Sequence, residues 1–162
     1  MSAFRVGIGY DIHRTAAGRR LRLAGVEIPD APGLSGHSDA DVVLHALGDA
    51  LLGAAGLGDI GELFPDTDPA FAGADSRALV RDVLQRVQAA GLAVHNADVV
   101  IQAERPRLTP FKPAMRAALA SLLEVGPHQV NIKAGTNEGL GAIGRGEAIA
   151  CWAAVTLKQT HP

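Results

Sequence analysis

The chain has 162 residues, a formal net charge of -2 and a single cysteine, Cys151. This length fits one compact domain, 1–162, and the balanced charge without a basic run disfavours binding to nucleic acid. A lone cysteine excludes an internal disulfide, and neither a targeting signal nor an apolar stretch of ~18 residues is recognisable, so we expect a cytoplasmic protein that does not enter a membrane.

The first predicted element is a strand that begins near Val6. Its apolar side chains alternate with the others at a period of two, which places the two sets on opposite faces. One face carries Val6, Ile8, Tyr10 and Ile12, and the other carries Gly7, Gly9, Asp11 and His13. We expect the apolar face to lie in the core and the glycines to leave the other face open, so that a ligand can reach Asp11 and His13.

A hairpin over 21–28 and a loop over 29–36 are predicted next. A helix then runs from Ser38 to about Ala55, with the Ser38 hydroxyl as its expected cap. The segment 56–73, rich in Pro, Gly and Asp, is predicted to be irregular. It is too long for a mere connection in a small domain, which indicates a ligand-binding loop.

His45 lies on this helix, four residues from Asp41 and four from Asp49. The three side chains therefore share one stripe, and a carboxylate could orient the imidazole. With Asp11 and His13, His45 makes a set of two imidazoles and one carboxylate, the pattern of catalytic zinc. The same set is typical of iron(II) oxygenases, although these usually have all-β folds, and a D-x-H pair also occurs on ordinary strands.

The second half of the chain mixes helices and strands. It is predicted to contain a helix over 76–91, a strand over 92–103, a helix from about 113 to 126, and strands over 130–134 and 148–157. This mixture, with an early hairpin and a strand-loop-strand ending, predicts an α+β fold. We expect a single domain with a mixed sheet covered on one face by about three helices.

The stretch 135–147 is rich in glycine, which lets backbone amides approach an anion closely. It contains G-x-G-x-x-G at 139–144, but the helix and further βα units of a dinucleotide-binding fold are missing. A flexible connection between strands is an equally valid interpretation. The hydroxyl of Thr136 and the carboxylate of Glu138 are two residues apart, which favours a site that binds a phosphate oxygen together with a hard divalent cation. The turn 37–39 is interpreted either as an ordinary helix cap or as a second phosphate site.

Five segments together carry a family signature. They are G-Y-D-I-H at 9–13, H-S-D-A-D-V-V-L-H-A-L-G-D-A-L-L-G-A at 37–54, L-G-D-I-G-E-L-F-P-D-T-D-P at 57–69, G-A-D-S-R at 73–77 and the glycine-rich stretch ending in G-R-G-E at 144–147. In this order, and over essentially the whole chain, they resemble the cyclodiphosphate synthase family of the non-mevalonate isoprenoid pathway.

The resemblance implies a catalytic set with two metal sites. Asp11, His13 and His45 would be zinc ligands, Glu138 would bind magnesium or manganese, and Thr136 would contact the substrate phosphates. The implied substrate-binding residues are His37, Ser38, Asp59, Ile60, Gly61, Asp66, Ala103, Pro106, Arg107, Thr136 and Arg145.

Some of these residues have more specific implied roles. His37 and Ser38 match a loop that closes over the methylerythritol 2-phosphate, and Asp59 matches the group that binds the methylerythritol hydroxyls. The segment 103–107 matches the cytidine pocket, and Arg145 lies near the axis of a homotrimer that has its active sites between subunits.

The implied activity is lyase-type cyclisation. The 2-phosphate of a cytidine diphosphate-linked methylerythritol attacks the β-phosphorus of the same molecule, and CMP leaves. Two other classes stay open on the residues alone. A hydrolase using zinc-bound hydroxide would give a linear product, and a non-catalytic trimeric binding module would use the metal only to hold an interface.

Overall fold

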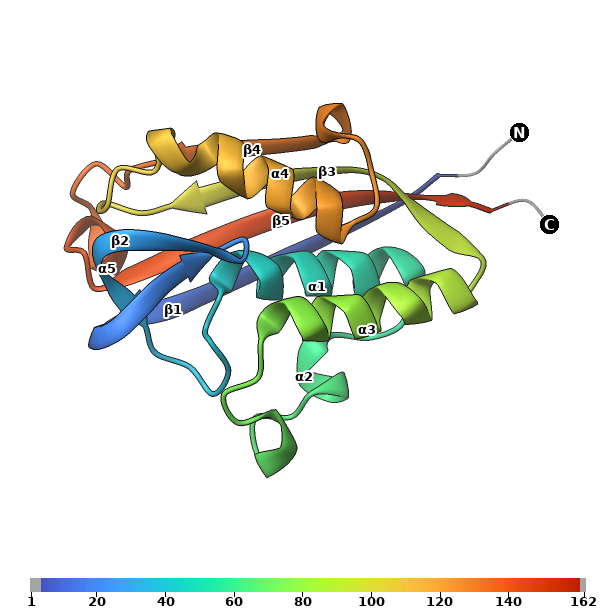
Figure 1. Ribbon diagram of the computed structural model, residues 1–162, viewed down its shortest axis with the longest axis horizontal. Helices are drawn as coiled ribbons and strands as arrows, with labels where there is room; N and C mark the ends of the chain where they lie inside the picture. Colours follow the sequence, from blue (N-terminus) through green and yellow to red (C-terminus); the bar gives the residue numbers. More distant parts are fainter. Residues whose placement is uncertain (1–3, 161–162) are drawn as a thin grey trace.

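Five strands form one mixed sheet in the order β2-β1-β5-β3-β4, in a computed structural model that describes residues 4–160 (Figure 1). The strands are β1 (Phe4–Leu23), β2 (Val26–Leu34), β3 (Leu92–Gln102), β4 (Val130–Gly135) and β5 (Ala148–Gln159). β1 pairs antiparallel with β2 and β5, β5 pairs antiparallel with β3, and β3 pairs parallel with β4. The predicted mixed α+β sheet is therefore confirmed.

Three longer helices, α1 (Val42–Ala55), α3 (Ser76–Ala89) and α4 (Lys112–Leu122), cover one face of the sheet (Figure 1). α1 packs across β1 and β5, α3 packs beside α1, and α4 packs on β4. Two short helices, α2 (Ile60–Leu63) and α5 (Gly141–Gly144), lie in the loops, and 3-10 turns lie at Pro69–Phe71, Thr109–Phe111 and Pro127–Gln129. Within residues 4–160, none of the helices combines the length and hydropathy needed to cross a bilayer.

The apolar face of β1 is exposed in the single chain, contrary to the prediction. Val6 is 71% and Ile8 is 74% exposed. Gly7 and Gly9 lie against α1 instead, since a Cβ atom built on Gly9 would be 1.9 Å from the carbonyl oxygen of Ala46. The glycines therefore do not leave their face open. They lack side chains where the backbone of α1 comes closest to the sheet.

Two predicted boundaries also differ. α1 begins at Val42, not at Ser38, because the Asp41 carboxylate caps it by accepting hydrogen bonds from the amides of Val43 and Leu44. The Ser38 hydroxyl accepts a hydrogen bond from Ala40 in the preceding turn. Most of the predicted loop 29–36 is strand, since β2 continues to Leu34.

Cys151 lies on β5, where its neighbours bury it completely. Burial raises the pKa of its thiol, because a thiolate would lose its hydration there. Cys151 is therefore poorly suited to act as a nucleophile.

Candidate functional site

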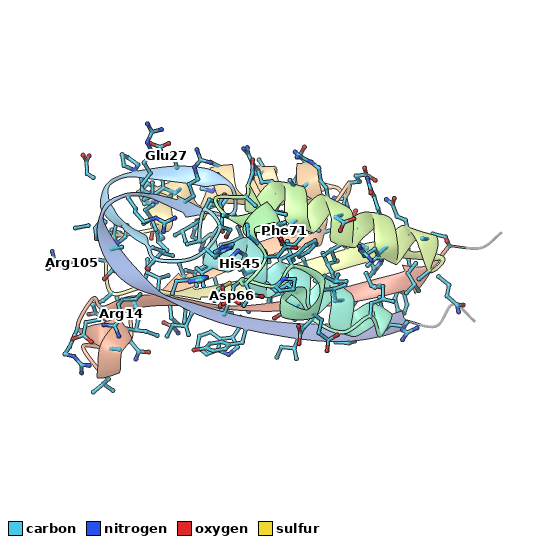
Figure 2. All side chains as sticks on the ribbon, turned by 90° about the horizontal axis from the view of Figure 1, so that it is seen from below. Arg14, Glu27, His45, Asp66, Phe71 and Arg105 are labelled. Atoms are coloured by element: carbon cyan, nitrogen blue, oxygen red, sulfur yellow. The ribbon has the colours of Figure 1, made fainter. Side chains whose placement is uncertain are left out.

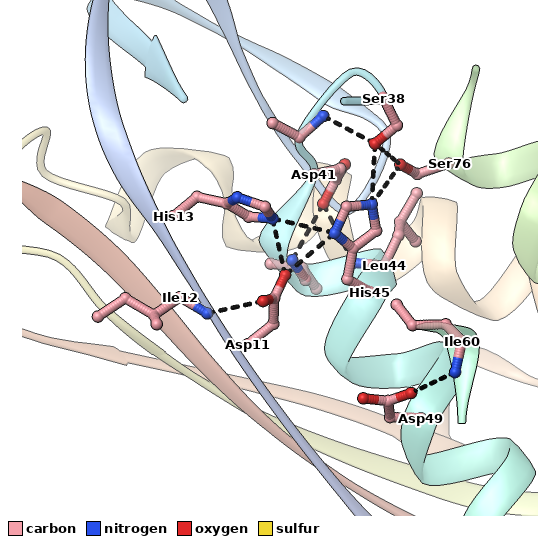
Figure 3. A network of polar contacts seen from close by, with 12 residues as sticks. Asp11, Ile12, His13, Ser38, Asp41, Leu44, His45, Asp49, Ile60 and Ser76 are labelled. Atoms are coloured by element: carbon pink, nitrogen blue, oxygen red, sulfur yellow. Dashed lines mark hydrogen bonds and ion pairs between the residues drawn. The ribbon is translucent and has the colours of Figure 1, made fainter. Parts of the chain in front are cut away.

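Asp11, His13 and His45 meet where β1 passes beneath the first turns of α1 (Figure 3). Asp11 and His13 are two apart on β1, so both point toward the helix, and His45 points back toward the strand. The Asp11 Oδ2 atom lies 2.8 Å from His13 Nε2 and 3.0 Å from His45 Nδ1. The two ring nitrogens are also 3.0 Å apart. The three donor atoms thus form a nearly equilateral triangle.

This triangle fits a divalent cation. Zinc bonds of ~2.0–2.2 Å place tetrahedral donor atoms roughly 3.3 Å apart, close to the observed separations. Without a cation, the two ring nitrogens carry at most two hydrogens for the three short contacts between these atoms. Among residues 4–160, this triplet is the one group of three or more His, Cys, Asp or Glu side chains that could hold a metal. Three protein donors are typical of catalytic sites.

The charges of the triplet are coupled. Burial by itself raises the pKa of Asp11, but hydrogen bonds and charge interactions with His13 and His45 outweigh it and hold that pKa well below its usual range. Burial lowers the pKa of His13, and the Asp11 carboxylate more than reverses this, so the His13 pKa is raised. Asp11 is therefore ionised at neutral pH, as an oxygen ligand must be.

The predicted stripe on α1 does not orient His45. Asp41 is fully buried and accepts hydrogen bonds from four backbone amides, those of Ala24, Gly25, Val43 and Leu44. Asp49 accepts one from the amide of Ile60. In the part of the chain that the structure describes, neither carboxylate bonds to the imidazole. Backbone amides from outside α1, those of Ala24 and Gly25 for Asp41 and that of Ile60 for Asp49, donate hydrogen bonds to the two carboxylates instead.

Two hydroxyls contact His45 in their place (Figure 3). The Oγ atoms of Ser38 and Ser76 each lie 3.0 Å from His45 Nε2. Sequence reasoning missed this role of Ser76, which it placed only at the start of a helix. The motif G-A-D-S-R contains Ser76, but its spacing from His45 gives no sign of contact.

A cleft of about 460 Å³ opens beside the triplet. Figure 2 shows His45, Asp66 and Phe71 close to one another in this region. The predicted site residues on its wall are His13, His37, Ser38, His45, Ile60, Gly61 and Asp66. Its remaining wall is largely apolar and includes Phe64.

A second cleft, of about 720 Å³, lies between β2, the segment after β3 and the end of β4. Its lining contains the predicted site residues Ala103, Pro106, Arg107 and Thr136. Among residues 4–160, the two clefts share no lining residue. Arg105, from the second cleft, lies far from His45 in Figure 2. One chain therefore does not bring the two groups of predicted residues together.

Apart from Asp11 of the triplet, three predicted site residues line neither cleft in the described part of the chain. Asp59 caps α2 by accepting a hydrogen bond from the Glu62 amide. Glu138 is exposed beside the second cleft, where its carboxylate accepts a 3.3 Å hydrogen bond from the Thr136 hydroxyl. Arg145 pairs with Glu147 at 2.8 Å on the surface.

The fold and the triplet together define an α+β protein with a candidate metal centre at the junction of sheet and helix. The chain belongs to the YgbB family, which matches it over residues 4–158. This confirms the resemblance seen in the sequence.

Named relatives agree with this assignment. The chain is 56% identical over 157 residues to the 2-C-methyl-D-erythritol 2,4-cyclodiphosphate synthase of Ralstonia pickettii, covering 97% of this chain and 94% of the relative. A solved structure of a synthase of that name in a CDP-bound form is 40% identical, with a TM-score of 0.87, covering 94% of this chain and 99% of the other. A Plasmodium falciparum IspF CDP complex is 29% identical, with a TM-score of 0.86 and 99% coverage of both chains.

Proposed function

We propose that this chain converts 4-diphosphocytidyl-2-C-methyl-D-erythritol 2-phosphate to 2-C-methyl-D-erythritol 2,4-cyclodiphosphate and CMP. The observation that carries the proposal is the convergence of Asp11, His13 and His45 at one cleft, in a chain 56% identical to a named synthase. The named relatives support the reaction assigned here. The triplet supplies the chemistry that this reaction needs.

The chemical difficulty is the meeting of two anions. At ~4 Å, two unit charges repel by about 4 kcal/mol at an effective dielectric constant near 20, and multiply charged phosphates repel more. We assign zinc to Asp11, His13 and His45, and magnesium or manganese to Glu138. Divalent ions held there supply Lewis acidity and neutralise phosphate charge. The anionic Asp11 adds affinity for the cation without adding a nucleophile.

The reaction needs no side-chain nucleophile. An oxygen of the 2-phosphate forms a bond to the β-phosphorus, while the bond from that phosphorus to the bridging oxygen breaks and CMP leaves with the electron pair. The protein holds the two ends of the substrate together, which can make a large contribution to the rate. Cys151, fully buried with a raised pKa, is unsuited to attack.

The two clefts hold the two ends of the substrate. The first cleft, beside Asp11, His13 and His45, is called the metal cleft. In it, His37 and Ser38 bind the 2-phosphate. The methylerythritol lies against Ile60, Gly61 and Asp66, with Asp59 nearby. In the second cleft, Ala103, Pro106 and Arg107 enclose the cytidine, and Thr136 and Arg145 serve the phosphates. The CDP bound in the related structures supports a cytidine diphosphate substrate.

For one substrate molecule to occupy both kinds of cleft, a neighbouring subunit has to bring them together. We infer a homotrimer of one-domain chains in which the metal cleft of one subunit adjoins the cytidine cleft of its neighbour. The exposed apolar face of β1 supports this, because a patch of this kind on a soluble domain marks an interface. It continues onto β5, where Trp152 is 38% exposed and its ring lies 4.8 Å from that of Tyr10.

Metal analysis with a phosphorus NMR assay tests the proposal. We expect bound zinc, and CMP released together with a cyclic diphosphate. CMP with a linear product would instead favour a hydrolase using zinc-bound hydroxide. Bound metal without any turnover would favour a non-catalytic trimer.

A further inference from the structure

The ring of His45 makes contacts at both of its nitrogens (Figure 3). Nδ1 lies 3.0 Å from the Asp11 carboxylate, inside the triplet. Nε2 points the other way, toward the hydroxyls of Ser38 and Ser76. An imidazole nitrogen binds a cation only when it carries no proton, so the proton of a neutral ring must be on Nε2. That N–H needs an acceptor.

The two hydroxyls differ in how they are held. Ser76 donates its hydroxyl hydrogen to Asp39 Oδ1, and its backbone amide donates to Asp39 Oδ2 at 3.3 Å. The hydrogen of Ser76 is thus engaged by a carboxylate, and a lone pair faces His45. Ser38 already accepts from the Ala40 amide, and within residues 4–160 no carboxylate bonds to its hydroxyl. Ser76 is the fixed acceptor of the pair.

Burial makes this acceptor important. Ser76 is fully buried, and Ser38 is 7% exposed. Loss of the Ser76 hydroxyl would leave the His45 N–H with Ser38 as its one remaining side-chain partner among the described residues. The start of α3 does not need that hydroxyl, because Asp75 is the cap and accepts from the Arg77 amide.

We propose that Ser76, clamped by Asp39, is a positioning residue that fixes the tautomer and ring orientation of His45, so that the Nδ1 lone pair faces the metal. The hydrogen bonds from His45 to Ser76 and from Ser76 to Asp39 make the imidazole a stronger metal ligand. The Asp39 carboxylate makes the Ser76 oxygen a better acceptor, and a stronger hydrogen bond from the Nε2 proton raises the electron density on Nδ1. This inference rests on the metal site assigned above.

Zinc affinity of three variants tests the inference, with Asp75→Ala as the matched control at the same helix terminus. Metal-stripped protein competes with a chromophoric chelator for zinc at fixed pH. We expect Ser76→Ala to weaken zinc binding by ~10–100-fold, the usual range for partners of metal-ligating histidines. Asp39→Asn keeps one oxygen acceptor and should give a smaller loss. Asp75→Ala should lower the urea midpoint of the metal-free protein but keep the wild-type zinc Kd.

Cobalt(II) absorption gives a second readout that a merely structural role would not move. Ser76→Ala should change the ligand-field bands of the cobalt-loaded protein, and Asp75→Ala should leave them unchanged. Wild-type zinc affinity in Ser76→Ala, or equal losses in Ser76→Ala and Asp75→Ala, would overturn the inference. If Ser76→Ala does not fold, Asp39→Asn takes its place: weaker zinc binding than in Asp75→Ala supports the inference, and wild-type zinc affinity overturns it. Wild-type protein that binds no zinc would overturn the metal site itself, which separates the two failures.

Discussion

Replacing Gly9 by Ala should separate the sheet from α1. A Cβ atom at this position would lie 1.9 Å from the Ala46 carbonyl oxygen and 2.8 Å from the Ala50 amide nitrogen. Carbon and oxygen normally approach to no less than about 3.3 Å, so the two backbones must move apart by more than ~1 Å. Overpacking costs about 1–3 kcal/mol where side chains can adjust. Here the obstacle is helix backbone, and we expect a loss of at least ~3 kcal/mol.

The same shift should weaken the metal centre, because Asp11 and His13 are carried by β1 and His45 by α1. Urea unfolding of the metal-free protein measures the first effect, and zinc competition measures the second. Gly53→Ala is the control, since its Cβ atom would meet nothing closer than 4.0 Å. Alanine there should be neutral or stabilise α1 by ~0.5–1 kcal/mol. A Gly9→Ala protein with wild-type midpoint and zinc Kd would refute this account of how helix and sheet pack.

Three other changes have defined outcomes. His45→Ala should abolish both zinc retention, by metal analysis, and CMP release; retained turnover would remove His45 from the site. Asp41→Ala leaves four backbone amides without their acceptor and should cost about 3 kcal/mol or more in urea unfolding. Hydrogen bonds from Arg77 lower the pKa of Asp75 below 3.8, so this pair stabilises the fold above that pH and the contribution is lost as pH falls through the lowered pKa. Asp75→Asn should therefore lose less than ~1 kcal/mol at pH 7, and the loss should shrink as the pH falls through the lowered pKa of Asp75.

Much of the fold follows from local patterns. Helical spacing of apolar residues predicted α3, whose Val80, Val83, Leu84 and Val87 are buried, and β3 lies within one residue of its predicted bounds. Predictions of this kind succeed because the periodicity of apolar residues is a property of the local sequence alone. The triplet was also predictable, since a two-residue spacing on a strand places Asp11 and His13 on one face, and His45 on the next helix completes a set of two imidazoles and one carboxylate.

The sequence by itself thus determined which side chains share a face and which residues could bind a cation. Only the tertiary structure decided which face of β1 meets α1, that Ser76 rather than Asp41 contacts His45, and that the predicted substrate residues lie in two separate clefts. Periodicity defines the faces of an element but not its packing partner. Contacts such as Ser76 to His45, 31 residues apart, depend on how whole elements pack against one another.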